Sequence, residues 1–192
     1  EVRLREAVES GEKAEILAEL ANLREHDGKP EEAFELRLKA LSDDPSDAVL
    51  LQRTQEQAVE LDHLGRYVDV LQELVEKRRR KEDSALAADL WLRLAEIAEL
   101  DLKDYERASA AYASAEETGE RLVEVWIGLA RIAAVQGDRD RQAALFEKIA
   151  ALPPESMTPE NRAQAAYGLA ELRLADAETR DAGVEALAAA LA

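Results

Sequence analysis

The chain has 192 residues, enough for one large domain or one repeat array, and its 47% hydrophobic content excludes a disordered chain. Its 42 acidic residues outnumber 25 basic ones, and the formal charge of -17 argues against nucleic acids and anionic membranes as general partners. The absence of cysteine excludes disulfides and thiolate chemistry, and two histidines are too few for a histidine-rich metal site.

Helix is predicted along almost the whole chain. Ala, Leu, Glu, Arg and Gln dominate, runs of β-branched residues are absent, and apolar residues recur three and four positions apart. Helix-breaking sequences separate these stretches at 26–30, 42–45, 63–65, 137–138 and 152–154. The pattern predicts helices of about three to four turns joined as hairpins by tight turns.

A small residue returns along the chain at spacings of 37, 37, 35 and 40 residues. The five residues, which we call the anchors, are Ala21, Ala58, Ala95, Ala130 and Ala170. A second helix follows each anchor in phase, and glycines stand seven residues after three anchors, at Gly28, Gly65 and Gly137. We expect these glycines to supply left-handed turns, and Pro45 and Pro154 to close second helices.

The spacing predicts one array of five repeats. Their expected bounds are about 14–46, 47–83, 84–120, 121–156 and 159–192. Residues 1–10 are expected to be the tail of a preceding repeat's second helix. Because the chain starts without Met and ends inside an apolar helical pattern, we expect it to be a fragment of a longer protein.

The third and fourth repeats carry the most specific residues. These are Trp-Leu-Arg-Leu-Ala at 91–95 and Trp-Ile-Gly-Leu-Ala at 126–130, with Ala108, Tyr112, Phe146 and Pro154. The pattern resembles the tetratricopeptide repeat (TPR) family. The resemblance implies an all-α fold, a right-handed α-solenoid of stacked antiparallel helix hairpins, with a concave groove lined mainly by first helices. Trp91 and Trp126 are then expected to be packing residues.

No residue pattern indicates catalysis. Phosphate-loop, nucleophile-elbow and His-Glu-x-x-His motifs are absent, and no carboxylate pair stands out. His26 and His63 lie one repeat apart, but a zinc site needs three or four ligands, so we interpret both as solvated turn residues. We therefore expect no enzyme activity, no metal and no cofactor.

Residues 77–81 form a basic block at the expected end of a second helix, where cations complement the helix dipole. This structural interpretation is favoured over a nuclear address or a phosphate-binding patch. No uncharged run reaches the roughly 20 residues of a spanning helix, so no membrane contact is expected from this segment. The compartment is left open, with the cytoplasm favoured.

Candidate binding residues flank the packing stripe of the expected first helices. They are Glu15, Asn22, Gln52, Gln55, Asp89, Glu96, Ile127, Arg131, Tyr167 and Glu171. Their charge is mixed, and only Asn22 matches the pattern with which chaperone-binding TPR proteins hold a terminal carboxylate. A carboxylate clamp is therefore not expected.

Two functions stay open. The first is a non-enzymatic protein-protein interaction scaffold that holds a basic or mixed peptide or helix of a partner in the concave groove, with no nucleic acid as partner. The second is a structural spacer or self-association segment of a longer solenoid. Val184, Leu187 and Leu191 form an apolar stripe that we expect further repeats or another copy to cover, which keeps homo-association through the C-terminal helix open.

Overall fold

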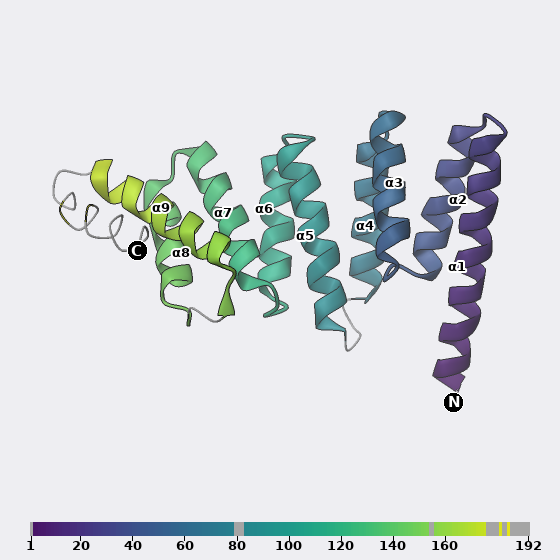
Figure 1. The fold of residues 1–192 in the computed structure, drawn as a ribbon, viewed down its shortest axis with the longest axis horizontal. Coiled ribbons are helices and arrows are strands. Elements are labelled where there is room, and N and C mark those ends of the chain that lie inside the picture. Colours follow the sequence, from purple (N-terminus) through teal and green to yellow (C-terminus); the bar gives the residue numbers. More distant parts are fainter. Residues whose placement is uncertain (1, 79–82, 154–155, 176–180, 182–183, 185–192) are drawn as a thin grey trace. The chain divides into compact units, whose positions relative to one another are not determined.

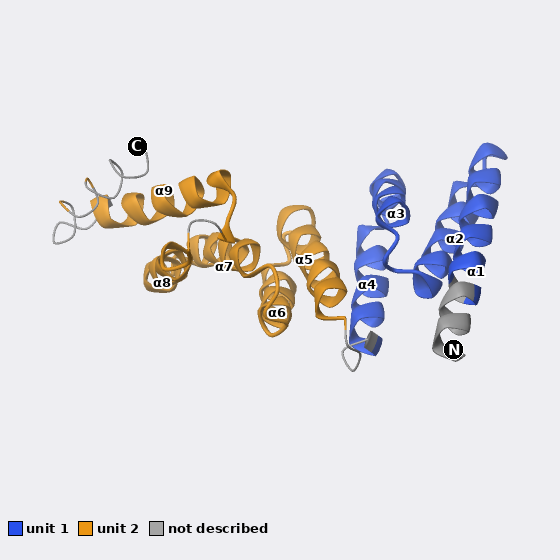
Figure 2. Ribbon diagram, turned by 60° about the horizontal axis from the view of Figure 1, so that its bottom comes forward, with its two compact units in different colours: residues 1–82 blue, residues 83–192 orange. Residues whose placement is uncertain are grey.

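The computed structural model describes residues 2–78, 83–153, 156–175, 181 and 184 (Figure 1). Within these residues the regular structure is helical, with no strand. The chain divides into two compact units, residues 1–82 and 83–192 (Figure 2). The expected all-α class is confirmed.

Unit 1 consists of two helix pairs that pack in chain order. The helices are α1 (Val2–His26), α2 (Pro30–Asp43), α3 (Ala48–Glu60) and α4 (Leu64–Arg78). α1 packs on α2, α2 contacts α3, and α3 packs on α4. Pro30 begins α2, where a missing N–H leaves no helical hydrogen bond unmade, and Pro45 follows the end of α2 as expected.

The start of the chain differs from the sequence-based expectation. Residues 1–10 are not the tail of a separate helix, because α1 runs unbroken from Val2 through the first anchor, Ala21. A separate helix would need a breaker before Ala14, and Gly11 alone is tolerated inside a helix at a cost of about 1 kcal/mol. The expectation was therefore wrong.

Unit 2 continues the same alternation of first and second helices. Its helices are α5 (Ser84–Leu100), α6 (Tyr105–Glu116), α7 (Leu122–Gln136), α8 (Arg139–Ala150) and α9 (Pro159–Ala175). In Figure 2, α5, α7 and α9 follow one another on one side of the unit, and α6 and α8 lie on the other. Pro154, Leu187 and Leu191 lie outside the described residues.

Aspartate side chains begin four of the helices. The carboxylates of Asp47, Asp83, Asp104 and Asp138 accept hydrogen bonds of 2.9–3.0 Å from backbone N–H groups in the first turn that follows. Each such cap stabilises a helix by about 1 kcal/mol. Part of the acidic excess of the chain therefore serves helix initiation.

Two of the three expected turn glycines adopt left-handed backbone conformations. Gly28 has φ 75° and Gly137 has φ 74°. Gly65 does not, because it lies inside α4, and the left-handed residue of that turn is Asp62 with φ 59°. Aspartate can take this conformation because its short polar side chain bonds locally.

The five anchors are completely buried where helices pack. Ala21, Ala58, Ala95, Ala130 and Ala170 each have 0% of their surface exposed. In unit 2, two glycines also admit aromatic rings from the preceding helix. A Cβ added to Gly128 would overlap the Tyr112 ring, and one added to Gly168 would overlap the Phe146 ring. Small side chains therefore set how closely successive helices approach.

We expect Gly128→Ala to destabilise unit 2 by about 1–3 kcal/mol, because the buried Tyr112 ring has no room to move away. Urea unfolding followed by circular dichroism measures this. Gly11→Ala is the matched control, since nothing lies within 4 Å of its added Cβ, and it should be neutral or slightly stabilising. Equal stability of Gly128→Ala and the parent would contradict the close contact with Tyr112.

Candidate functional site

Each first helix carries a row formed by the residues three before, one after and, except in α3, five after its anchor. These positions are four residues apart and therefore adjoin on a helix surface. We call this face the first-helix strip. Seven of the candidates lie on it: Asn22, Gln55, Glu96, Ile127, Arg131, Tyr167 and Glu171. Glu15, Gln52 and Asp89 lie one turn further toward the helix start.

In unit 2 the strip has apolar ends and a charged middle. Leu100, Val135 and Tyr167 are 52%, 59% and 55% exposed, which is high for large apolar side chains. Ile127, a candidate from the sequence, is only 5% exposed and contributes to packing instead. The exposed apolar residues on α5 and α7 are thus one turn beyond the candidates that the sequence indicated.

A buried hydrogen-bond network holds the middle of this strip. Arg131 donates two hydrogen bonds of 2.7 Å to the buried Glu99, one to each carboxylate oxygen. The Tyr112 hydroxyl donates to Glu99 at 2.7 Å and accepts from Arg131 at 3.1 Å. Burial and the bond to Glu99 raise the pKa of Tyr112 far above its ordinary value, so its hydroxyl stays protonated. The charge of Arg131 is therefore compensated within the unit.

Three other carboxylates of unit 2 differ in how they are paired. Asp89 is bound by Arg121 at 2.7 Å. Glu96 is exposed at the surface, but partial desolvation by its neighbours raises its pKa more than the charges of nearby arginines, Arg131 first among them, lower it. Glu171 is exposed and bonds with Tyr167, which raises the pKa of that phenol. Glu96 and Glu171 are thus the carboxylates on the strip that a cationic group could approach.

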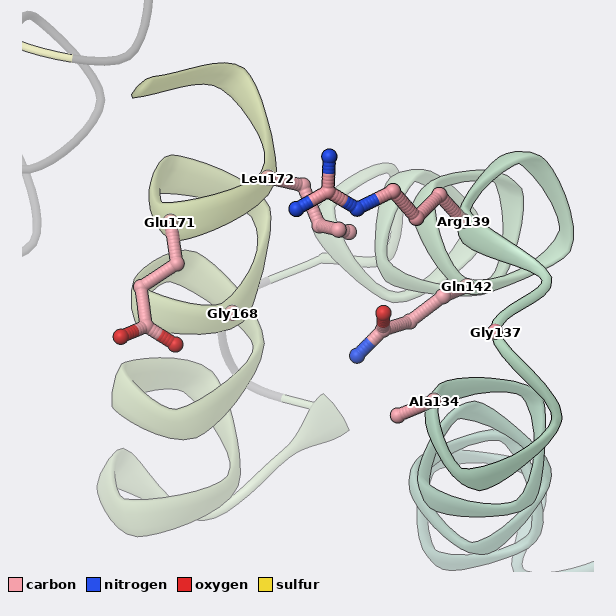
Figure 3. Close-up of a pocket in the computed structure, with 7 residues that line it drawn as sticks. All are labelled: Ala134, Gly137, Arg139, Gln142, Gly168, Glu171 and Leu172. Atoms are coloured by element: carbon pink, nitrogen blue, oxygen red, sulfur yellow. The ribbon is translucent and has the colours of Figure 1, made fainter. Parts of the chain in front are cut away.

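Glu171 also lines an open pocket of about 410 Å³ between α9 and the turn that joins α7 to α8 (Figure 3). Figure 3 shows the Arg139 and Gln142 side chains reaching into the space in front of α9. The other lining residues are Ala134, Gly137, Gly168 and Leu172. Mixed charge and little apolar lining favour a solvated edge of the strip over a small-molecule site.

Unit 1 places a buried arginine beside an open pocket of about 490 Å³ between α1 and α3. Arg37, 2% exposed, donates to Gln57 at 2.5 Å, to Asn22 at 2.8 Å and to Glu25 at 2.5 Å. Gln57 in turn donates to the Pro30 carbonyl at 3.0 Å. These bonds tie together α1, α2 and α3.

Sequence analysis did not identify Arg37, Glu99 or Tyr112 as members of polar networks. The sequence signal for a buried charge was a charged residue between two apolar ones, as with Arg37 between Leu36 and Leu38. Of the remaining candidates in unit 1, Glu15 and Gln52 are exposed and Gln55 is half-buried. The candidates fall into two units, four in unit 1 and six in unit 2.

The two tryptophans differ in environment. Trp91 is buried, as expected for a packing residue. Trp126 is only partly buried. Its indole N–H donates to Glu116 at 2.7 Å, and Lys148 Nζ lies 5.3 Å from its ring centre. The indole bond lowers the pKa of Glu116. Trp126 therefore packs at the edge of unit 2.

The two histidines also differ. His26 is exposed, whereas His63 bonds through Nε2 to Glu31 at 2.9 Å and its ring centre lies 5.6 Å from that of Phe34. His63 thus connects the turn before α4 to α2. The described residues contain no group of three or more side chains placed to bind a metal ion.

The basic block is described only in part. Lys77 lies 3.4 Å from Glu73, one turn earlier in α4, whereas residues 79–81 lie outside the described residues. No helix in the described part of the chain is both long enough and apolar enough to span a bilayer.

We expect Arg131→Met to destabilise unit 2 by about 3 kcal/mol, because it leaves the buried Glu99 carboxylate without its cation. Glu99→Leu combined with Arg131→Met should cost less than the sum of the single changes. Arg121→Met is the matched control, since its pair with Asp89 is exposed and worth less than about 1 kcal/mol. Additive losses in urea unfolding would show that the two residues are not coupled.

We expect Glu31→Gln to lower stability at about pH 5 and to have a smaller effect at about pH 8. The hydrogen bond that the His63 ring makes to the Glu31 carboxylate raises the pKa of His63 above its ordinary value of 6.5. The stabilisation is therefore fully present below that value and is lost as pH rises through the raised one. Thermal unfolding and NMR titration of the His63 ring measure the effect, with Glu35→Gln as control. An unchanged His63 pKa in Glu31→Gln would contradict it.

Comparison with known proteins identifies the fold. No protein-family model matches the sequence, and no curated protein matches it. The crystal structure of MamA protein is 16% identical, with TM-score 0.62 over 94% of this chain and 91% of that chain. MamA 41-end from Desulfovibrio magneticus RS-1 is 15% identical, with TM-score 0.60 over 94% of each chain. TTC0263, a thermophilic TPR protein in Thermus thermophilus, is 22% identical over 93% of this chain and 90% of that one, with TM-score 0.45. The two MamA structures therefore show the fold of this chain, which is an all-α array of stacked helix hairpins.

Proposed function

We propose that the chain is a non-enzymatic interaction scaffold, and that unit 2 binds an amphipathic, positively charged segment of a partner protein along the strips of α5, α7 and α9. The observation that carries this proposal is the distribution of exposed apolar side chains between first and second helices. The carboxylates of Glu96 and Glu171 on the same strips support a positively charged partner.

Leu100, Val135 and Tyr167 each lie on a strip of unit 2, and each is more than half exposed. By contrast, the described residues of α6 and α8 include no exposed large apolar side chain. Exposed apolar groups among polar ones are typical of protein interaction sites. A pure spacer would have no need to keep apolar groups on one layer of helices, so this difference favours binding over the alternative.

The charge of the same surface favours a basic or mixed partner. Arg131 is compensated by Glu99, and Arg121 by Asp89 and Glu124. Glu96 and Glu171 remain as the carboxylates of the strip. Lys or Arg side chains that flank an apolar stripe would pair with them and would relieve the cost of ionising Glu96.

A direct test uses an 18-residue helical peptide with Leu at the i, i+3, i+4 and i+7 positions and Lys elsewhere. We expect saturable binding that weakens as salt rises, because exposed ion pairs are screened. Leu100→Arg with Val135→Arg should weaken binding at least about tenfold. Ala113→Arg, an exposed position of α6, is the matched control and should bind like the parent. Fluorescence anisotropy gives the Kd values.

A second peptide with Glu in place of Lys should bind much more weakly. Equal binding of both peptides would refute the acidic character of the site. An equal loss in Ala113→Arg and in the double variant would refute its location on the strip.

A further inference from the structure

The residue four positions after the anchor is acidic in the first three repeats. In the first repeat it is Glu25, which accepts a hydrogen bond from Arg37 of α2. In the third it is Glu99, which accepts one from Tyr112 of α6 at 2.7 Å. Arg37 and Tyr112 are each the eighth residue of their second helix. Asp62 stands at the acidic position in the second repeat. Two repeats thus join their first helix to their second through a carboxylate at one repeat position.

The fourth repeat lacks both members of this pair. Its residue four after the anchor is Ala134, and the eighth residue of α8 is Phe146, which has no polar side-chain atom. A methyl group leaves free the space that a glutamate side chain takes in the other repeats. The open pocket of about 410 Å³ has Ala134 in its wall (Figure 3). It therefore lies where this repeat supplies no carboxylate of its own.

Two polar side chains of α8 point into this pocket. Arg139 is the first residue of α8 and Gln142 lies one turn later, and both reach into the space in front of α9 (Figure 3). Neither side chain makes a hydrogen bond or an ion pair within the described part of the chain. A guanidinium and an amide N–H₂ that converge on one space can both donate to a carboxylate. The pocket thus has donors for the group that it lacks.

The other rim of the pocket carries Glu171, one residue after the anchor, where the repeat before has Arg131. A carboxylate that enters alone would be repelled by Glu171. A helical partner avoids this repulsion, because side chains three or four residues apart lie on one face of a helix. A glutamate can then reach Arg139 and Gln142 while a lysine one turn away pairs with Glu171.

We propose that the fourth-repeat pocket, formed by Ala134, Arg139, Gln142 and Glu171, binds a glutamate side chain of the partner segment, with a lysine of the same segment on Glu171. This inference rests on the proposed binding along the strips and makes it more specific. The partner is basic except at this one place. Its carboxylate takes the part that Glu25 and Glu99 play within the chain.

The test uses the whole chain and the 18-residue peptide of leucines and lysines, acetylated and amidated so that it has no terminal charge. Each lysine is replaced in turn by glutamate, and isothermal titration calorimetry gives the Kd values. At one position the glutamate peptide should bind about threefold more tightly than the all-lysine peptide, as expected for one ion pair at a partly exposed site. At the other positions glutamate should weaken binding, because the site as a whole is acidic.

Charge reversal then locates the contact. Arg139→Glu should reverse the preference, so that the all-lysine peptide binds about threefold more tightly than the selected glutamate peptide. An acid in the first turn of α8 is compatible with the helix dipole. Arg141→Glu is the matched control, since Arg141 is exposed in the same turn but does not line the pocket, and it should keep the parent's preference. Ala134→Glu supplies a carboxylate from the chain itself and should abolish the gain from glutamate.

Two results would overturn this proposal and leave the proposed function standing. One is tighter binding of the all-lysine peptide than of every glutamate peptide. The other is a preference for glutamate that Arg139→Glu and Arg141→Glu reduce equally. If no peptide of the set binds, both proposals are refuted. If a glutamate peptide binds through Arg139 and the all-lysine peptide does not bind, the pocket is supported and the lysine-rich partner is wrong.

Discussion

A methyl-sized side chain buried between packed helices is the constraint on which the rest of the structure depends. All five anchor alanines are fully buried, and two glycines of unit 2 receive aromatic rings from the helix before. A larger side chain at any of these points would separate the helices and expose the apolar stripe behind it. Since a single hairpin cannot bury that stripe alone, close approach within a pair is what makes stacking between pairs effective.

Polar networks fix how the packed helices are aligned with one another. In unit 1, Arg37 joins its own pair to the next through Asn22, Glu25 and Gln57. In unit 2, Glu99, Tyr112 and Arg131 connect α5, α6 and α7. We regard both networks as devices that specify alignment, because a buried ion pair contributes little net stability but is costly to break. They also remove charges from the surface, so the charges available to a partner are fewer than the composition suggests.

The two exposed apolar surfaces lie in different units. The strips of unit 2 carry Leu100, Val135 and Tyr167, which are each more than half exposed although α6 and α8 pack against α5, α7 and α9. On α1, Ile16, Leu20 and Leu23 are exposed at the positions where α7 buries Val125, Leu129 and Ile132.

The sequence by itself determined the class of fold, the helix pairs and the anchors, because periodicity reports which residue of each repeat meets the same neighbour. It also predicted that Pro45 follows the end of a second helix. It did not reveal that α1 is continuous, that Asp62 rather than Gly65 takes the left-handed turn, or that Ile127 is buried and Trp126 only partly so. The partners of Arg37 and Glu99 were likewise decided by tertiary structure, since they come from other helices, up to 32 residues away. Periodicity places a residue on a face, but burial and pairing depend on what the neighbouring helix presents to that face.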